Sequence, residues 1–264
     1  MSGHRFVDVA VSRPDLRVPF PRRFTNRLIG QTVVTLTRRA KYLLATLSSG
    51  DTLLMHLGMS GWFRIDVDSA VPDGRRARVP TDAGRHDHVA FRMSSKVIVT
   101  FNDPRRFGFM DLLSPERLAS HPVLSGLGLE PLSAEFDAAA LAQACKGKRT
   151  SLKVTLLDQR VVAGLGNIYV SEALHRARLS PFRHASTLAT PTGSPRPIAG
   201  PLTAAIKQVL TEAIDRESGT NYGSARFRVY DREGQRCQTR GCDGTIRRRT
   251  QTGRSTFYCP RCQR

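Results

Sequence analysis

The C-terminal stretch CQTRGCDGTIRRRTQTGRSTFYCPRCQR (237–264) contains four of the chain's five cysteines. They form two close pairs with the spacing C-x4-C-x16-C-x2-C, which leaves room for a strand, a turn and a strand between the pairs. Such pairs can place four thiolates around Zn²⁺. The alternatives are two disulfides or four unrelated thiols, and the chain shows no secretion signal that would favour disulfides. The sequence therefore predicts one zinc site formed by Cys237, Cys242, Cys259 and Cys262.

A closed set of four thiolates leaves no open coordination position, so this zinc is expected to be structural. The segment between the pairs, 246–258, predicts a β-hairpin with Thr-Gly-Arg at or near its turn and Arg254 at its tip. The three arginines at 247–249 fit either phosphate contact or a solvated charged face. Cys145 lies in a helical pattern and is expected to be a small buried hydrophobic residue.

The charge balance predicts a polyanionic partner. The 264 residues include 41 Lys and Arg against 22 Asp and Glu, a net charge of 41 − 22 = +19. Basic side chains that neutralise phosphates release counterions, which favours nucleic acid. A membrane surface and mere solubility are the alternatives, but the sequence shows no cationic amphipathic helix, lipidation signal or apolar run of membrane length. We expect a cytoplasmic protein that binds no membrane.

The chain before the cysteines predicts a β-rich half followed by a helical half. Short apolar runs with turn punctuation between them suggest a sandwich or barrel. After about residue 130, helix formers follow residues that can cap a helix, and a loop rich in Pro, Ser, Thr and Gly covers 186–200. The expected strands cover 33–36, 42–47, 52–57, 88–93, 96–101 and 108–113, and the expected helices cover 137–148, 150–158, 167–177 and 201–217.

Several stretches across nearly the whole chain together resemble one family, the formamidopyrimidine-DNA glycosylases. These bifunctional base-excision-repair enzymes remove oxidised purines and nick the resulting abasic site. The stretches follow the family order and end on the cysteine-rich segment. They are RRAKYLL (38–44), MHLGMSGWFRI (55–65), RHDHVAF (85–91), NDPRRFGFM (102–110), GLGLEPLS (126–133) and LLDQRVVAGLGNIYVSEALHRARLSP (156–181).

The resemblance implies an α+β multidomain fold: a β-sandwich over 1–128, a helix–two-turn–helix domain over 129–222 and a zinc finger over 223–264. It implies a monomer that binds double-stranded DNA with an oxidised base or an abasic site, associates with the bacterial nucleoid, and flips the damaged nucleotide out of the stack. Its activity would combine glycosylase and lyase steps with β,δ-elimination.

Roles for single residues are also implied by the resemblance. Lys41 is similar to the lysine that assists β-elimination and touches a phosphate near the lesion, and Arg254 to the arginine linked to δ-elimination. Arg254 is expected to act electrostatically, because arginine does not give up its proton freely. Met59, Arg105 and Phe107 resemble the wedge that fills the space of the flipped base. The implied DNA contacts are His56, His86, Lys148 and Asn167.

Two features depart from the family pattern. The family begins with a Pro-Glu pair whose proline amine is the nucleophile, whereas this sequence begins Met-Ser-Gly-His. Either the start is misassigned, which we favour, or the chain is truncated at its N-terminus and catalytically impaired. The loop after the last expected helix, ESGTNYGSAR (217–226), is shorter than usual, so the capping of the flipped base and the lesion preference are expected to differ.

Three other functions compete with this interpretation. A catalytically impaired protein that binds damaged DNA is the main alternative, because the Pro-Glu pair is missing. An endonuclease VIII-like enzyme for oxidised pyrimidines is disfavoured by the combination of Met59, Arg105 and Phe107. An unrelated zinc-ribbon protein would share only the cysteines and would not explain GLGNIY (164–169) or DPRRFG (103–108).

Overall fold

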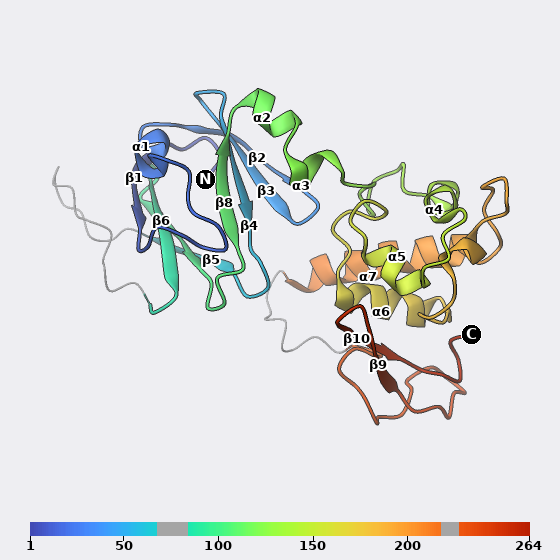
Figure 1. The fold of residues 1–264 in the computed structure, drawn as a ribbon. Helices are drawn as coiled ribbons and strands as arrows, with labels where there is room; N and C mark the ends of the chain where they lie inside the picture. Colours follow the sequence, from blue (N-terminus) through green and yellow to red (C-terminus); the bar gives the residue numbers. More distant parts are fainter. Residues whose placement is uncertain (68–83, 218–226) are drawn as a thin grey trace. The chain divides into compact units, whose positions relative to one another are not determined.

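The computed structural model describes residues 1–67, 84–217 and 227–264. The chain divides into two compact units, Met1–Ser125 and Gly126–Arg264, which we call the sandwich unit and the helical unit (Figure 1). The loop expected to be short, 217–226, lies almost entirely outside the described residues. Within the part of the chain that the structure describes, no helix is long and apolar enough to span a membrane.

The sandwich unit contains two four-stranded sheets in which every pairing is antiparallel. One sheet has the order β1-β6-β7-β5 and the other β2-β3-β4-β8. The predicted β-sandwich is therefore confirmed. The strands are β1 (Phe6–Val11), β2 (Val33–Arg39), β3 (Tyr42–Leu47), β4 (Thr52–His56), β5 (Trp62–Val67), β6 (Asp87–Met93), β7 (Val97–Asn102) and β8 (Phe109–Leu113).

The inner faces of the two sheets form one apolar core. Phe91 and Phe101 from one sheet and Leu53 and Met55 from the other are almost fully buried. Apolar faces that meet in this way exclude water from both sheets, and this burial is the main force that holds the layers together. Three short helices complete the unit: α1 (Phe24–Leu28), α2 (Pro115–Ala119) and α3 (Pro122–Ser125).

The helical unit packs its helices around a second apolar core, which includes Leu156, Leu165, Val170 and Ile206. The side chain of Asp137 caps the first helix by accepting the Ala140 N–H at 2.7 Å, as the sequence predicts. The elements are α4 (Ala138–Cys145), α5 (Leu152–Leu157), α6 (Asn167–Arg176), the 3-10 helix η1 (Ala185–Leu188), α7 (Ala199–Glu217), β9 (Arg247–Gln251) and β10 (Arg254–Tyr258).

The turn between α5 and α6 is closed by one glutamine. The Gln159 amide donates to the carbonyl oxygens of Leu157 and Leu165, and its oxygen accepts the Gly164 N–H at 2.9 Å. Gly164 has φ = 78°, a left-handed conformation that favours glycine. The turn thereby fixes where α6 begins, and Asn167 is the first residue of that helix, as expected.

The predicted hairpin is present as β9 and β10, with Arg254 opposite Gln251 at the turn end. A small apolar cluster that includes Val229, Ile246 and Phe257 lies against the cysteines. Cys145 is fully buried in the main helical core, as predicted, and burial raises the pKa of its thiol to about 11.

Candidate functional site

The strands of both sheets end in register at the positions where the predicted site residues lie. Tyr42 pairs with His56, and His56 pairs with Phe109. In the other sheet, Asn102 pairs with both Trp62 and Asp87. Two segments, 57–61 and 103–108, connect one sheet to the other at these ends, and we call them the crossing turns. The predicted residues of this unit lie in these turns or beside these strand ends: Lys41, His56, Met59, His86, Arg105 and Phe107.

The two crossing turns touch through their backbones. Gly58 has φ = 70°, and a Cβ on it would lie 2.5 Å from the backbone nitrogen of Gly108. The buried carboxylate of Asp103 accepts the Ser60 hydroxyl at 2.6 Å and the Gly108 N–H at 2.8 Å. The Arg105 N–H in turn donates to the Ser60 hydroxyl at 3.3 Å. Asp103 was not among the predicted site residues, yet it joins both turns.

The crossing turns carry three side chains that project from the protein. Met59 is 72% exposed and Phe107 is 42% exposed, so neither belongs to the core. The Arg105 guanidinium lies 4.6 Å from the centre of the Phe107 ring, a cation–π geometry. The structure therefore brings Met59, Arg105 and Phe107 onto two adjoining turns. An apolar side chain exposed to this degree beside a planar pair is a suitable surface for contact with stacked bases.

Positive side chains surround His56 at the end of β4. Its Nδ1 accepts the Gly58 N–H at 3.0 Å, which leaves Nε2 as the protonated nitrogen of the neutral ring. Partial burial lowers the pKa of His56, and the charges of Lys41 and Arg17 lower it further. Lys41 is exposed in the turn between β2 and β3. Sequence reasoning missed Arg17, whose backbone N–H donates to the Gly108 carbonyl at 3.1 Å and for which no motif gave a signal.

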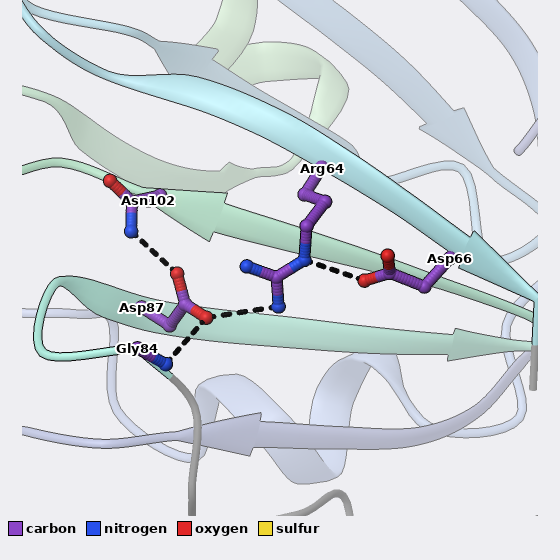
Figure 2. A network of polar contacts seen from close by, with 5 residues as sticks. All are labelled: Arg64, Asp66, Gly84, Asp87 and Asn102. Atoms are coloured by element: carbon purple, nitrogen blue, oxygen red, sulfur yellow. Dashed lines mark hydrogen bonds and ion pairs between the residues drawn. The ribbon is translucent and has the colours of Figure 1, made fainter.

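His86 lies half-buried before β6, where a buried carboxylate organises the backbone (Figure 2). The side chain of Asp87 is 1% exposed and accepts the Arg64 guanidinium at 3.0 Å, the Gly84 N–H at 3.0 Å and the Asn102 amide at 2.6 Å. Figure 2 shows these contacts joining β5, β6 and β7 at one end of their sheet. Asp87 thus fixes the strand end that carries His86.

In the helical unit the structure brings Asn167 close to the hairpin turn. The Asn167 side-chain amide donates to the Ser255 carbonyl at 3.1 Å, next to the exposed Arg254. Lys148 lies exposed between α4 and α5, and the hydrogen bonds described for it run to Cys145 and Ser186, not to this pair.

A buried lysine that sequence reasoning missed also supports the hairpin turn. Lys153 is fully buried, and its Nζ donates to the Ser255 carbonyl at 2.7 Å and to the Thr256 hydroxyl at 2.8 Å. Burial lowers the pKa of Lys153 to about 8, and the charge of Arg254 contributes to the shift. The only available signal was a lysine inside the apolar stretch LKVTLL (152–157).

The four C-terminal cysteines form a cluster that fits a tetrahedral metal site. Their sulfurs all lie within 4.8 Å of one another, and none of the four forms a disulfide. Zn–S bonds of about 2.3 Å imply sulfur–sulfur edges of about 3.8 Å. The Cys237–Cys262 and Cys242–Cys259 sulfurs are 3.8 and 3.7 Å apart. A Cβ at Gly244 would lie 2.7 Å from the Cys259 sulfur, so the backbone there closes tightly around the cluster.

Ionisation within the cysteine cluster is uneven. Burial disfavours the Cys237 thiolate, but hydrogen bonds from Thr239 and His175 outweigh burial and lower its pKa. Burial and the neighbouring sulfurs raise the pKa of Cys262. A bound cation would favour the ionised form of all four thiols.

Two family models match most of the chain. The formamidopyrimidine-DNA glycosylase N-terminal domain matches residues 1–110, and the formamidopyrimidine-DNA glycosylase H2TH domain matches residues 127–224. A formamidopyrimidine-DNA glycosylase of Rhodopseudomonas palustris (strain BisA53) is 55% identical over all of this chain and 94% of its own length. One from Bradyrhizobium diazoefficiens is 54% identical with the same coverage.

Solved structures agree with this match. The Lactococcus lactis formamidopyrimidine-DNA glycosylase bound to DNA with an abasic site has a TM-score of 0.81 and 26% identity, over 100% of this chain and 94% of that one. A MutM complex with DNA containing carbocyclic 8-oxo-G has a TM-score of 0.82, 25% identity and the same coverage.

Proposed function

This chain belongs to the formamidopyrimidine-DNA glycosylase family, and we propose that it removes oxidised purines from double-stranded DNA in base-excision repair. The substrates are 8-oxoguanine and formamidopyrimidines, and an abasic-site lyase step follows base removal. Solved relatives bound to DNA with an abasic site, 8-oxo-G or FAPY-dG support this substrate class. The net charge of +19 suits a DNA partner.

The exposed wedge is the observation that carries the proposal. Removing a base from a duplex requires the nucleotide to leave the stack, because its reacting sugar carbon is inaccessible within the helix. A side chain that enters the vacated space restores part of the lost stacking. Met59 is 72% exposed on a turn that is hydrogen-bonded to Asp103 through Ser60, and Arg105 stacked on Phe107 adds a planar surface and donors for the orphaned base.

The remaining predicted residues act on the phosphates in this proposal. His56 donates through Nε2 to a phosphate, and Lys41 and Arg17 beside it add positive charge. His86, just before β6, contacts the DNA backbone. In the helical unit, Asn167 and the first N–H groups of α6 form a phosphate site, as helix N-termini do. Lys148 adds a contact nearer to α4.

We assign the elimination chemistry to Lys41 and Arg254. Lys41 assists β-elimination near the lesion phosphate, where an ammonium group offers both charge and a transferable proton. Arg254, exposed at the hairpin turn, stabilises the departing phosphate in δ-elimination through its charge. The roles proposed here for single residues concern DNA binding, base displacement and elimination.

The four-cysteine cluster holds one structural zinc ion in this proposal. The sulfur–sulfur distances and the tight approach of Gly244 fit a four-thiolate site that is closed to substrate. The zinc supplies no reaction step; it fixes the hairpin that carries Arg254. The protein is expected to act as a monomer.

A duplex with one 8-oxoguanine tests the function. We expect release of the oxidised base and a strand break at its position, and the Arg254→Ala variant should accumulate the β-elimination product. Tight binding to the lesion without base release would support the alternative of a damaged-DNA-binding protein. The proposal would be contradicted if the protein neither released the oxidised base nor bound the lesion duplex in preference to intact DNA.

A further inference from the structure

One helix contacts the C-terminal finger along its whole length. At its start, the Asn167 amide donates to the Ser255 carbonyl. In its middle, the buried carboxylate of Glu172 accepts three successive backbone N–H groups, those of residues 228–230, each at 2.9 Å. Near its end, His175 reaches the cysteine cluster. Helix α6 therefore holds the hairpin turn, the segment that leads into the finger, and the metal site.

His175 contacts a candidate metal ligand directly. It is 2% exposed, and its Nε2 lies 3.4 Å from the Cys237 sulfur and 3.3 Å from the Thr239 hydroxyl. Its Nδ1 is buried and has no hydrogen-bond partner among the described residues. A proton on Nδ1 would therefore be a buried donor without an acceptor, whereas a proton on Nε2 points at sulfur. The contacts therefore favour Nε2, and not Nδ1, as the ring nitrogen that carries the proton.

A thiolate bound to zinc remains a strong acceptor. Four thiolates and one Zn²⁺ leave the site with an excess negative charge, which N–H donors disperse. Two backbone groups already donate to cysteine sulfurs: the Thr239 nitrogen lies 3.5 Å from the Cys237 sulfur, and the Gly244 nitrogen lies 3.4 Å from the Cys242 sulfur. His175 adds a donor that comes from outside the finger.

We propose that His175 is a positioning residue of the metal site: its Nε2–H donates to the zinc-bound Cys237 thiolate and fastens the site to α6. This inference rests on the proposed zinc. Because the same helix begins with Asn167, the contact links the metal site to the turn that carries Arg254. Outer hydrogen bonds to metal ligands typically change metal affinity by about 10- to 100-fold, so loss of this donor should weaken zinc retention.

Two substitutions separate the hydrogen bond from simple packing. His175→Phe keeps a ring but loses the donor, and His175→Gln keeps an N–H donor. We expect zinc to leave the His175→Phe protein at least about 10-fold faster than the wild type when a chromophoric chelator is added, and His175→Gln to restore most of the retention. His184→Phe, a change at an exposed histidine of the same unit, is the control and should release zinc at the wild-type rate. Equal rates for wild type and His175→Phe, or equal losses for Phe and Gln, would overturn the proposal.

A measurement on the wild-type protein decides the question even if a variant fails to fold. In protein substituted with an NMR-active cadmium isotope, we expect the imidazole proton on Nε2 and a scalar coupling between that proton and the metal across the N–H···S bond. A proton on Nδ1, or direct imidazole coordination in place of Cys237, would refute the assignment. Neither zinc release nor the NMR measurement depends on DNA or on catalysis. A failure of the His175 proposal would therefore leave the proposed glycosylase function untouched.

Discussion

Asp103 shows how a single buried residue can determine the geometry of the whole wedge. Its carboxylate accepts Ser60 from one crossing turn and Gly108 from the other. Both turns leave their strands at the same end of the sandwich, so neither is held by a sheet. Without this carboxylate, the exposed side chains would rest on backbone that has lost its main polar link.

Replacing Asp103 with Asn should destabilise the sandwich unit by about 1–3 kcal/mol. In the wild type, both carboxylate oxygens accept a hydrogen bond, whereas the NH₂ group of Asn would face one of these donors and could not accept from it. Ser60→Ala removes only one of the two bonds and should cost less. Denaturant unfolding of each variant checks the order. Equal stability of Asp103→Asn and wild type would show that the turns are held by other contacts.

His56 should titrate below its usual range in the free protein. Burial, Lys41 and Arg17 disfavour its charged form, so the folded state binds fewer protons than the unfolded state between the lowered pKa and 6.5. The contribution of His56 to stability therefore rises with pH through that window and falls as the pH drops. Phosphate favours the charged ring, so DNA binding should raise this pKa. NMR titration of the ring with and without DNA measures both, and a pKa that DNA leaves unchanged would argue against a phosphate contact.

Lys153 gives a prediction of the same sign in the alkaline range, for the helical unit. Its folded-state pKa of about 8 lies below the ordinary value of 10.5, so the unfolded state binds more protons between these values. The wild type should therefore gain stability relative to Lys153→Met as the pH rises through this range, by at most about 1.4 kcal/mol per pH unit. Lys146→Met, at an exposed lysine, should follow the wild type. A constant difference between wild type and Lys153→Met would contradict the prediction.

At the scale of elements, the sequence predicted the strands and helices that have strong apolar periodicity. Strands β3, β4, β6, β7 and β8 and helices α4 to α7 lie where the sequence predicts them. Strand β1 was missed, and β5, an edge strand with mostly exposed side chains, was not separated from its surroundings. Helices α1, α2 and α3 have 5, 5 and 4 residues, too few for a helical period to show.

The predicted site residues came from motifs, whereas the residues that hold them came only from the fold. The structure adds Arg17, Asp103 and Lys153, whose hydrogen-bond partners lie far away in the sequence. For Arg17 and Lys153 these partners include backbone carbonyl groups. Such partners depend on how turns meet in space, which no local pattern records. The roles of the motif residues remain predictions until they are measured with DNA.

Met59 should contribute to DNA affinity and not to the stability of the fold. Met59→Ala should lower the affinity for a duplex with an abasic-site analogue by about 10-fold, or about 1.4 kcal/mol, because an inserted apolar side chain compensates part of the lost base stacking. The unfolding free energy should stay within about 0.5 kcal/mol, because the residue is exposed. Ile65→Ala is a matched control, since Ile65 is 71% exposed on β5. An equal loss of affinity in both variants would point to a general apolar effect.

At the scale of the whole molecule, charge and lesion recognition make separate contributions. The net charge of +19 gives affinity for any duplex, and this part weakens as salt rises. The wedge gives preference for a site where a base is already missing, because no stacking must be lost there. The layout of a sandwich unit followed by a helical unit that ends in a cysteine-bearing hairpin could be predicted from composition, spacing and the family resemblance, because the sandwich, the helices and the hairpin each have their own sequence pattern and their own apolar cluster.

The most direct test compares the affinity of the wild-type protein for two duplexes of one sequence, intact or with one abasic-site analogue, at the same moderate salt concentration. The wedge account predicts binding at least about 10-fold tighter to the abasic duplex, and a ratio near one in the Met59→Ala variant combined with Phe107→Ala. Equal affinity of the wild type for both duplexes would contradict the account, because charge alone would then explain its binding to DNA.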